Sequence, residues 1–204
     1  RQFEIAIPAY EKVVAAVPDD WESWNNLGNT RRLAGDFEGS LAALERAGEL
    51  NSASPPVRLN HAMALAKVGR VGDAEQQLRR LVDEHPGDTK PVLELHAILK
   101  ELGREEDALA AIEEASRRAP SDVELLMAVA SERLSLMKTD AAEQTYREVL
   151  ELRPNHDLAN LGVAVVLELT NRTDDLTALV EDAQNRGAGE NAVNFIRAMD
   201  QRRH

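Results

Sequence analysis

The chain contains no cysteine in its 204 residues. This absence excludes disulfide bonds, thiolate catalysis and cysteine-based zinc sites. Aromatic residues are also scarce, at 3% of the sequence, although 43% of it is hydrophobic and alanine and leucine are plentiful. Because strands are enriched in aromatic and β-branched residues, this composition favours closely packed helices over a β-sheet.

Basic residues are outnumbered by acidic ones, which gives a formal net charge of −12 and a pI of about 4.9. Nucleic-acid backbones and anionic membrane surfaces are bound through Lys and Arg, so we expect neither as a partner. No apolar run approaches the length of a membrane span, and no signal segment opens the sequence. We therefore expect no membrane insertion and a cytoplasmic location, which the lack of cysteine also fits; a periplasmic location is not excluded.

Motifs for nucleotide binding are missing as well. Gly69, Gly72 and Gly87 are isolated, and no Gly-Lys-Ser/Thr follows them as a phosphate-binding loop requires. The Gly187-Ala188-Gly189 segment lacks a preceding strand. We interpret these glycines as turn or linker residues and expect no cofactor.

The histidines and carboxylates do not form a recognisable catalytic or metal site. His61 and His96 lack a second histidine one turn away, and Glu94 is too close in sequence to share a face with His96. Both are interpreted as core histidines, whereas His85 and His156 flank loop prolines and are expected to be solvated. The many carboxylates are expected on solvated helix faces, where no burial shifts a pKa. The sequence thus predicts no catalytic residue, no metal site and no enzyme.

A period of 34 residues organises the sequence. Four columns keep this spacing without insertion: small residues, larger apolar residues four positions later, turn glycines, and prolines with one serine. The columns are Ala6, Ser40, Ala74, Ala108 and Ala142; Tyr10, Leu44, Leu78, Ile112 and Tyr146; Gly35, Gly69 and Gly103; and Pro18, Ser52, Pro86, Pro120 and Pro154.

Each column has a physical reason within a helical hairpin. A small side chain lets two helices approach closely, and the larger residue fills the space beside it. Glycine permits the left-handed turn after the first helix, and proline ends the second. The repeated unit is therefore predicted to be a pair of antiparallel helices.

The Asn26-Leu27-Gly28 segment with Trp24 ahead, in phase with these columns, resembles the tetratricopeptide repeat. The resemblance covers nearly the whole chain and implies an all-α fold, a right-handed α-solenoid of tandem antiparallel helix hairpins. We expect a single array over 1–204. It comprises a half repeat at 3–18, full repeats at 21–54, 55–88, 89–122, 123–156 and 157–190, and a terminal helix or the start of another repeat at 190–203. Leu176 in the small column and Ala188 in the proline column make the last full repeat the weakest match.

The array begins and ends within a repeat, and Arg1 is not a methionine, so we interpret the chain as a piece of a longer, bacterial array. Solenoid ends need polar capping helices, and none is evident. We expect the first helix to expose Phe3, Ile5, Ile7 and Val14, which would favour self-association through open ends.

In this family the first helices of successive repeats line a concave groove that holds peptides, and the resemblance assigns groove positions in this chain. They are Asn25, Asn26, Asn29 and Arg32 in the first full repeat, Asn60, Met63 and Lys67 in the second, Lys90, Leu93 and Lys100 in the third, Met127 in the fourth, and Leu161 and Val165 in the fifth. Asparagine suits a peptide backbone because its amide both donates and accepts.

A subclass of the family clamps the C-terminal carboxylate of peptides with two Lys, two Asn and an Arg. Asn29, Asn60 and Lys90 match this pattern. Asn25 stands where a lysine is expected, and Glu94 where an arginine is expected. Because Glu94 would repel a carboxylate, we do not expect a true clamp.

The fourth and fifth repeats place apolar residues on the same predicted face: Met127, Leu134, Leu158, Leu161, Val165 and Leu169. Two interpretations stay open, an exposed binding surface or burial between neighbouring helices. Leu161→Glu separates them, because it should abolish partner binding in the first case and unfold the chain in the second.

Three functional hypotheses follow. The leading one is a protein-interaction scaffold that binds a peptide or partner helix in the groove. The main alternative is a non-catalytic regulatory or substrate-presenting region of a larger enzyme, such as a repeat-fused sulfotransferase or glycosyltransferase. A third is a structural assembly subunit, which would form stable oligomers without peptide affinity.

Overall fold

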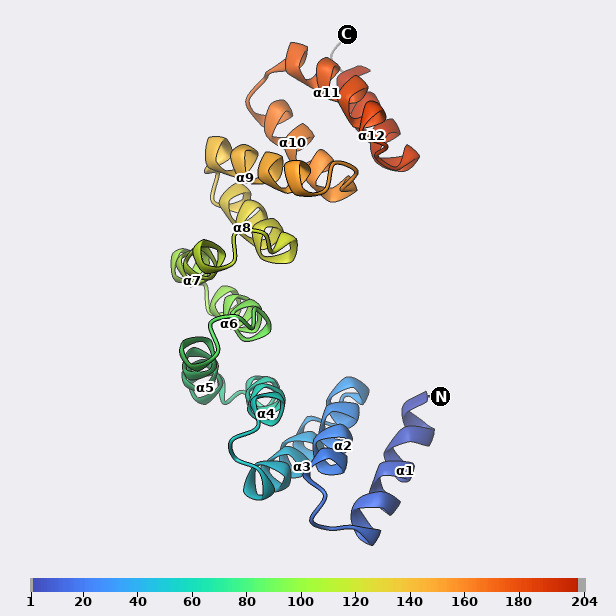
Figure 1. The fold of residues 1–204 in the computed structure, drawn as a ribbon, viewed down its shortest axis with the longest axis vertical. Helices are drawn as coiled ribbons and strands as arrows, with labels where there is room; N and C mark the ends of the chain where they lie inside the picture. Colours follow the sequence, from blue (N-terminus) through green and yellow to red (C-terminus); the bar gives the residue numbers. More distant parts are fainter. Residues whose placement is uncertain (1, 202–204) are drawn as a thin grey trace. The chain divides into compact units, whose positions relative to one another are not determined.

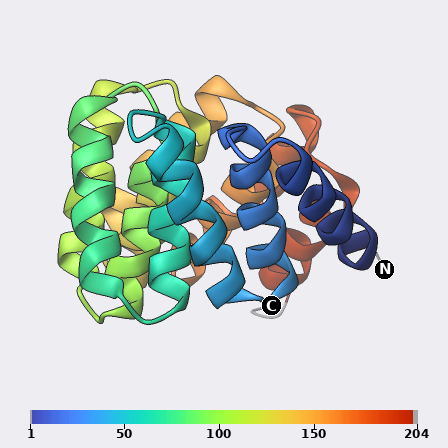
Figure 2. The same ribbon diagram turned by 90° about the horizontal axis from the view of Figure 1, so that it is seen from below.

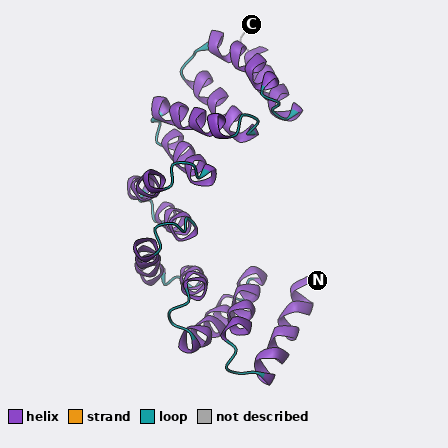
Figure 3. Ribbon diagram, viewed as in Figure 1, coloured by secondary structure: helices purple, strands orange, loops and turns teal. Residues whose placement is uncertain are grey.

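The computed structural model describes residues 2–201, which form α-helices and short loops without a strand (Figures 1 and 3). The twelve helices described are α1 (Gln2–Ala16), α2 (Trp21–Ala34), α3 (Phe37–Leu50), α4 (Pro55–Lys67), α5 (Val71–Glu84), α6 (Lys90–Glu101), α7 (Glu105–Arg118), α8 (Val123–Ser135), α9 (Thr139–Leu152), α10 (Asp157–Leu169), α11 (Thr173–Asn185) and α12 (Glu190–Gln201). The predicted all-α, helical-repeat class is confirmed.

Each of the five predicted full repeats contains two of these helices, from α2 and α3 in 21–54 to α10 and α11 in 157–190. The predicted terminal helix over 190–203 corresponds to α12, and positions 202 and 203 lie outside the described residues. No described helix combines the length and the apolar character that a membrane span requires.

The chain divides into two compact units, unit 1 over residues 1–102 and unit 2 over residues 103–204. In unit 1, α2 packs against α1, α3 and α4, while α4 also contacts α5 and α6 (blue to green in Figures 1 and 2). In unit 2, α8 packs against α7, α9 and α10, and α10 also contacts α9, α11 and α12. First helices therefore lie beside first helices within each unit.

The turns between paired helices keep the 34-residue period in their backbone geometry. Gly35, Gly69 and Gly103 have φ values of 87°, 84° and 67°, as the glycine column predicts. The next two positions of this column are Met137 and Asn171, with φ of 56° and 59°. The left-handed turn thus continues through positions where the sequence has no glycine.

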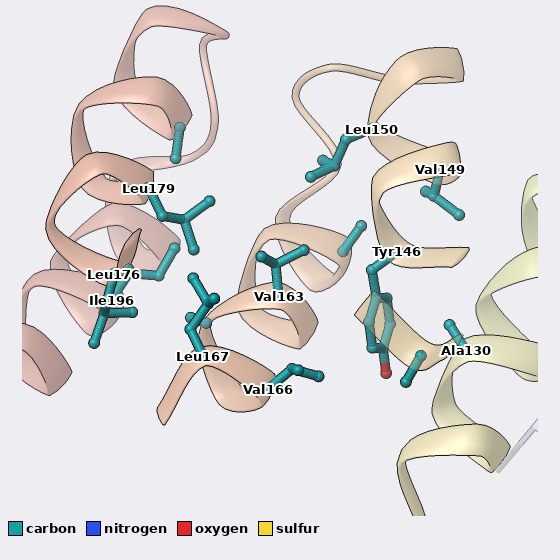
Figure 4. Packing of buried hydrophobic residues seen from close by; sticks show 14 of the residues in the cluster. Ala130, Tyr146, Val149, Leu150, Val163, Val166, Leu167, Leu176, Leu179 and Ile196 are labelled. Atoms are coloured by element: carbon teal, nitrogen blue, oxygen red, sulfur yellow. The ribbon is translucent and has the colours of Figure 1, made fainter. Parts of the chain in front are cut away.

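The columns of small and large residues form the contacts between paired helices. Ser40, Ala74, Ala108 and Ala142 have no exposed surface, and Leu44, Leu78 and Ile112 are equally buried. In unit 2, Tyr146 of α9 lies between Ala130 of α8 and Val163 of α10 (Figure 4). Leu176, which breaks the small column, is only 1% exposed and joins the same core.

The prediction for the first helix is partly wrong. Phe3 and Ile5 are 39% and 75% exposed, but Val14 is 6% exposed and Ile7 is half-buried. Val14 packs with Leu27 in a small core, and Ile7 lies against it. These two residues pack toward α2, whereas Phe3 and Ile5 present apolar side chains to solvent.

His156 is not simply solvated, as its place beside a proline suggested. Its Nδ1 accepts a hydrogen bond from the backbone N–H of Ala159 at 3.2 Å, so the imidazole caps the start of α10. His61 is half-buried, as predicted, and its Nδ1 lies 3.0 Å from Oε1 of Gln77. Both histidines therefore have structural partners.

Candidate functional site: two first-helix faces

The predicted groove residues of unit 1 come from three adjacent helices. We call this set the first-helix face of unit 1: Asn25, Asn26, Asn29 and Arg32 of α2, Asn60, Met63 and Lys67 of α4, and Lys90, Leu93, Glu94 and Lys100 of α6. Because α4 contacts both α2 and α6, the three segments lie side by side.

A hydrogen bond between two asparagines joins the first two helices of this face. Nδ2 of Asn60 donates to Oδ1 of Asn25 over 2.9 Å, and both side chains are half-buried. The residues are 35 positions apart, so this pair links successive repeats. The sequence placed both on the face but did not predict that they bond to each other.

The same face carries a carboxylate, Glu94, that interacts electrostatically with two cations. Partial burial raises the pKa of Glu94, and attraction to Arg32 and Lys67 opposes that rise. The three side chains come from α6, α2 and α4. Nη2 of Arg32 also donates to Oδ1 of Asn29 at 2.8 Å, while Nε of Arg32 is buried without a partner among the described residues.

The other predicted residues of this face are more dispersed. Asn26, Lys67, Lys90 and Lys100 are exposed, whereas Met63 and Leu93 are half-buried. Lys90 opens α6 and Lys100 lies near its end, which separates them by about 15 Å along the helix axis. The two lysines are therefore too far apart to bind the same small anionic group.

The first-helix face of unit 2 is apolar. Met127 of α8 and Leu161 and Val165 of α10 are half-buried and pack against the core of the unit, as does Leu134. Three neighbours remain exposed: Leu158 at 64%, Leu169 at 53% and Phe195 at 50%. Part of this face therefore packs against the core, and part of it presents apolar surface to solvent.

A shallow groove opens where α8 and α10 begin. It is lined by Ser121, Asp122, Val123, Glu124, Met127, Arg153, His156 and Leu158. Met127 and Leu158 supply apolar walls, and Glu124 and Arg153 are charged and exposed.

Phe195 was missed because the groove assignment stopped at the fifth repeat, although a further helix was predicted over 190–203. It lies 34 positions after Leu161 and 68 after Met127, and α12 packs against α10. The same column of the period therefore continues onto α12, and that spacing was the available signal.

Within residues 2–201, no group of three or more His, Asp or Glu side chains is placed to hold a metal ion. The expectation that carboxylates lie on solvated helix faces is wrong for Glu132 and Glu143, which are buried. Oε1 of Glu143 accepts hydrogen bonds from Arg147, and Oε2 accepts one from Nη1 of Arg172 at 2.5 Å. This pairing ties α9 to the start of α11.

Paired helices with a 34-residue period and adjoining first helices define a helical-repeat protein. Three tetratricopeptide repeat family models match the chain, over residues 1–55, 31–99 and 123–156, which together span more than half of it. The chain belongs to the tetratricopeptide repeat family, as the sequence motifs indicated. No curated protein matches it.

Solved structures with the same fold share little sequence with this chain. YrrB, described as a tetratricopeptide repeat protein with an unusual peptide-binding site, is 16% identical, with a TM-score of 0.62 over 93% of this chain and 98% of its own. MamA is also 16% identical, with a TM-score of 0.65 over 81% and 91%. The C-terminal part of a repeat protein from Cytophaga hutchinsonii gives 0.75 at 17% identity, over 91% and 76%.

Proposed function

We propose that this chain is a protein-interaction scaffold that binds a peptide or a partner helix on its first-helix faces. The observation that carries the proposal is the hydrogen bond between Asn25 and Asn60 of successive repeats, on a face that also carries the interacting charges of Arg32, Lys67 and Glu94. Five polar side chains from three helices thus converge on one face.

The asparagine pair keeps hydrogen-bonding capacity for a ligand. Only one donor of Asn60 and one acceptor of Asn25 are used between them. The Asn25 amide N–H₂ and the Asn60 carbonyl oxygen have no partner among the described residues, which offers a donor and an acceptor side by side. A peptide backbone presents the complementary N–H and C=O groups, so an extended segment fits this pair.

The charged residues on the same face restrict the kind of peptide that it can bind. Arg32 and Lys67 attract acidic groups, but Glu94 interacts electrostatically with both of these cations and would repel a free carboxylate. With Asn25 in place of lysine and Glu94 in place of arginine, the face lacks two members of the carboxylate clamp. We therefore propose an internal peptide segment as the ligand, in preference to a chain terminus. The peptide-binding site described for YrrB, which has the same fold, is consistent with this proposal.

The experiment is a peptide-array screen with the whole chain, followed by affinity measurements for the peptides retained. Asn25→Ala combined with Asn60→Ala should weaken binding of backbone-held peptides about thirtyfold, since each of the two lost hydrogen bonds is worth about 1 kcal/mol. Asn185→Ala, at the exposed end of α11, is the matched control and should change nothing. Equal affinities for the double variant and the control would remove the function from this face.

A further inference from the structure

The exposed side of α10 carries a straight apolar stripe. Leu158, Leu161, Val165 and Leu169 follow one another at spacings of three, four and four residues, which confines them to an arc of about 80° on the helix. The stripe runs for about 16 Å along the axis. Leu158 and Leu169 at its two ends are more than half exposed, while Leu161 and Val165 between them anchor it to the core.

Apolar side chains of the two adjacent helices flank this stripe. Met127 of α8 and Phe195 of α12 lie 34 positions before and after Leu161, and both helices contact α10. Phe195 is half exposed, and Met127 lines the groove where α8 and α10 begin. Within unit 2, apolar residues in the same column of the period therefore occur on both helices that contact α10.

The direction of the stripe indicates the shape of the occupant. Apolar residues three and four apart form a ridge parallel to the helix axis, which packs against the matching ridge of a second helix. An extended strand presents every second side chain and makes its hydrogen bonds through its backbone. Among the residues of unit 2 that the structure describes, no side-chain amide pair like that of Asn25 and Asn60 joins the first helices, so a partner helix fits the stripe better than an extended segment.

The charge of unit 2 indicates the charge that a partner should carry. Residues 103–204 contain twelve Lys and Arg against twenty Asp and Glu, a formal charge of −8. Glu124 stands exposed beside Met127 and Leu158, and Glu168 lies on α10 within the stripe's length. Arg153 in the groove is the exception among these flanking residues. Such a field attracts a cationic partner and speeds its association.

We propose that unit 2 docks a basic amphipathic helix of a partner protein, whose apolar face lies along the α10 stripe and whose flanks carry Lys and Arg. This rests on the proposed function, since it takes the first-helix faces to be binding surfaces. It adds that the two faces differ in the ligand they select, an extended polar segment on unit 1 and a basic helix on unit 2.

The test uses three designed peptides of about four helical turns and the whole chain. The first has leucines at helical spacing with lysine flanks, the second replaces each lysine by glutamate, and the third rearranges the first into a strict alternation of leucine and lysine. The first peptide should bind at least tenfold more tightly than either of the others, and its affinity should fall with added salt because the attraction is screened. Comparable binding of all three, or no binding of the first, would overturn the proposal.

Variants then locate the contact. Leu158→Glu combined with Leu169→Glu should weaken binding of the first peptide at least tenfold, because both side chains are exposed and their change leaves the core intact. Leu152→Glu, 45% exposed on α9, is the matched control and should bind as the wild type does. Circular dichroism should show equal helicity for all three proteins. Undiminished affinity of the double variant would place the peptide elsewhere and overturn the assignment to α10.

The proposals for the two faces can be refuted independently of each other. If array peptides still depend on Asn25 and Asn60 while the basic helix does not bind, the scaffold function stands and the inference about unit 2 is wrong. If Leu158→Glu with Leu169→Glu instead abolishes self-association of the wild type in sedimentation, a second copy occupies the stripe and the proposed partner is again wrong.

Discussion

The aromatic ring of Tyr146 lies directly against the backbone of Gly162, so that α9 and α10 approach closely at this point. A Cβ atom at position 162 would lie 2.5 Å from Cε1 and Cζ of the ring. The ring cannot move aside easily, because Tyr146 is only 5% exposed and is part of the unit 2 core (Figure 4). Burial also raises the pKa of its hydroxyl, against a hydrogen bond with Ser131 that lowers it. Glycine is therefore required at 162 by packing, not by backbone conformation.

We expect Gly162→Ala to lower the free energy of unfolding by about 1–3 kcal/mol, the range for overpacking a filled core. Gly48→Ala is the matched control, because position 48 is also helical and has open space where a Cβ would lie. There alanine should raise stability by about 0.5–1 kcal/mol through its better helix propensity. Urea denaturation of the three proteins measures both effects; a shift of the same sign in the two variants would contradict the packing argument.

Met137→Gly should stabilise unit 2. Met137 has a φ of 56° and is 66% exposed, so it bears the left-handed strain of an L-residue without burial to offset it. Relieving that strain should stabilise the fold by about 1–2 kcal/mol. The greater freedom of glycine in the unfolded chain lowers stability and cancels part of this gain. We expect a net gain of about 0.5–1 kcal/mol in denaturant unfolding.

Asn171→Gly provides the comparison for that variant. Asn171 has nearly the same φ, 59°, but asparagine tolerates the left-handed region better than methionine does. The gain from glycine should therefore be smaller at 171 than at 137. A larger gain at 171 would show that side-chain contacts, rather than backbone strain, decide these positions.

Glu94→Gln should alter the dependence of stability on pH. Burial raises the pKa of Glu94 above its usual 4.5, so the folded state holds this proton more tightly than the unfolded state does. The cost of ionising Glu94 in the folded protein is absent below the pKa of the unfolded state. This loss of stability grows as pH rises through the pKa of the folded state and is complete above it. The variant should therefore be more stable than the wild type at neutral pH, and the difference should vanish toward pH of about 4.

The control for this variant is Glu101→Gln, which changes an exposed carboxylate on the last residue of the same helix. It should leave stability within about 0.5 kcal/mol at every pH. Thermal or urea unfolding over a pH series gives the comparison. If Glu94→Gln were instead less stable at neutral pH, attraction to Arg32 and Lys67 would outweigh the burial of the carboxylate.

Glu143→Gln should weaken the connection between α9 and α11. The carboxylate has 10% side-chain exposure and pairs with Arg147 and Arg172. Hydrogen bonds to Asp175 and Glu143 raise the pKa of Arg172, so the arginine stays charged beside whatever replaces its partner. Since both arginines are partly exposed, we expect a loss of about 1–2 kcal/mol rather than the larger cost of a fully buried pair. Glu151→Gln, exposed near the end of α9, should cost almost nothing by the same unfolding assay.

The period of 34 made most of the fold predictable, because each column records a local requirement of a hairpin. Small residues such as Ser40 and Ala74 mark where helices touch, and Gly35 and Gly69 mark the turns. These demands act between residues close in sequence, so the spacing alone reveals them. The helix pairs, the family and the apolar character of the unit 2 face followed from that spacing.

Contacts between repeats could not be read in the same way. Three features depend on how neighbouring helices are placed. Asn60 donates to Asn25, Val14 is buried while Ile5 is not, and Met137 adopts the left-handed conformation that glycine has in the earlier repeats. Met137 shows the reason clearly, since local preference opposes its conformation and the packing of α8 on α9 imposes it.

By itself, the sequence determined that the chain repeats, that its elements are helices and where each helix turns, because side-chain size and backbone freedom act within one hairpin. Only the tertiary structure decided what the first-helix faces offer. In unit 1 it paired two asparagines and brought a carboxylate within electrostatic reach of two cations, and in unit 2 it left Leu158, Leu169 and Phe195 in solvent. Exposure and electrostatic partners are properties of several helices together, and no single repeat contains them.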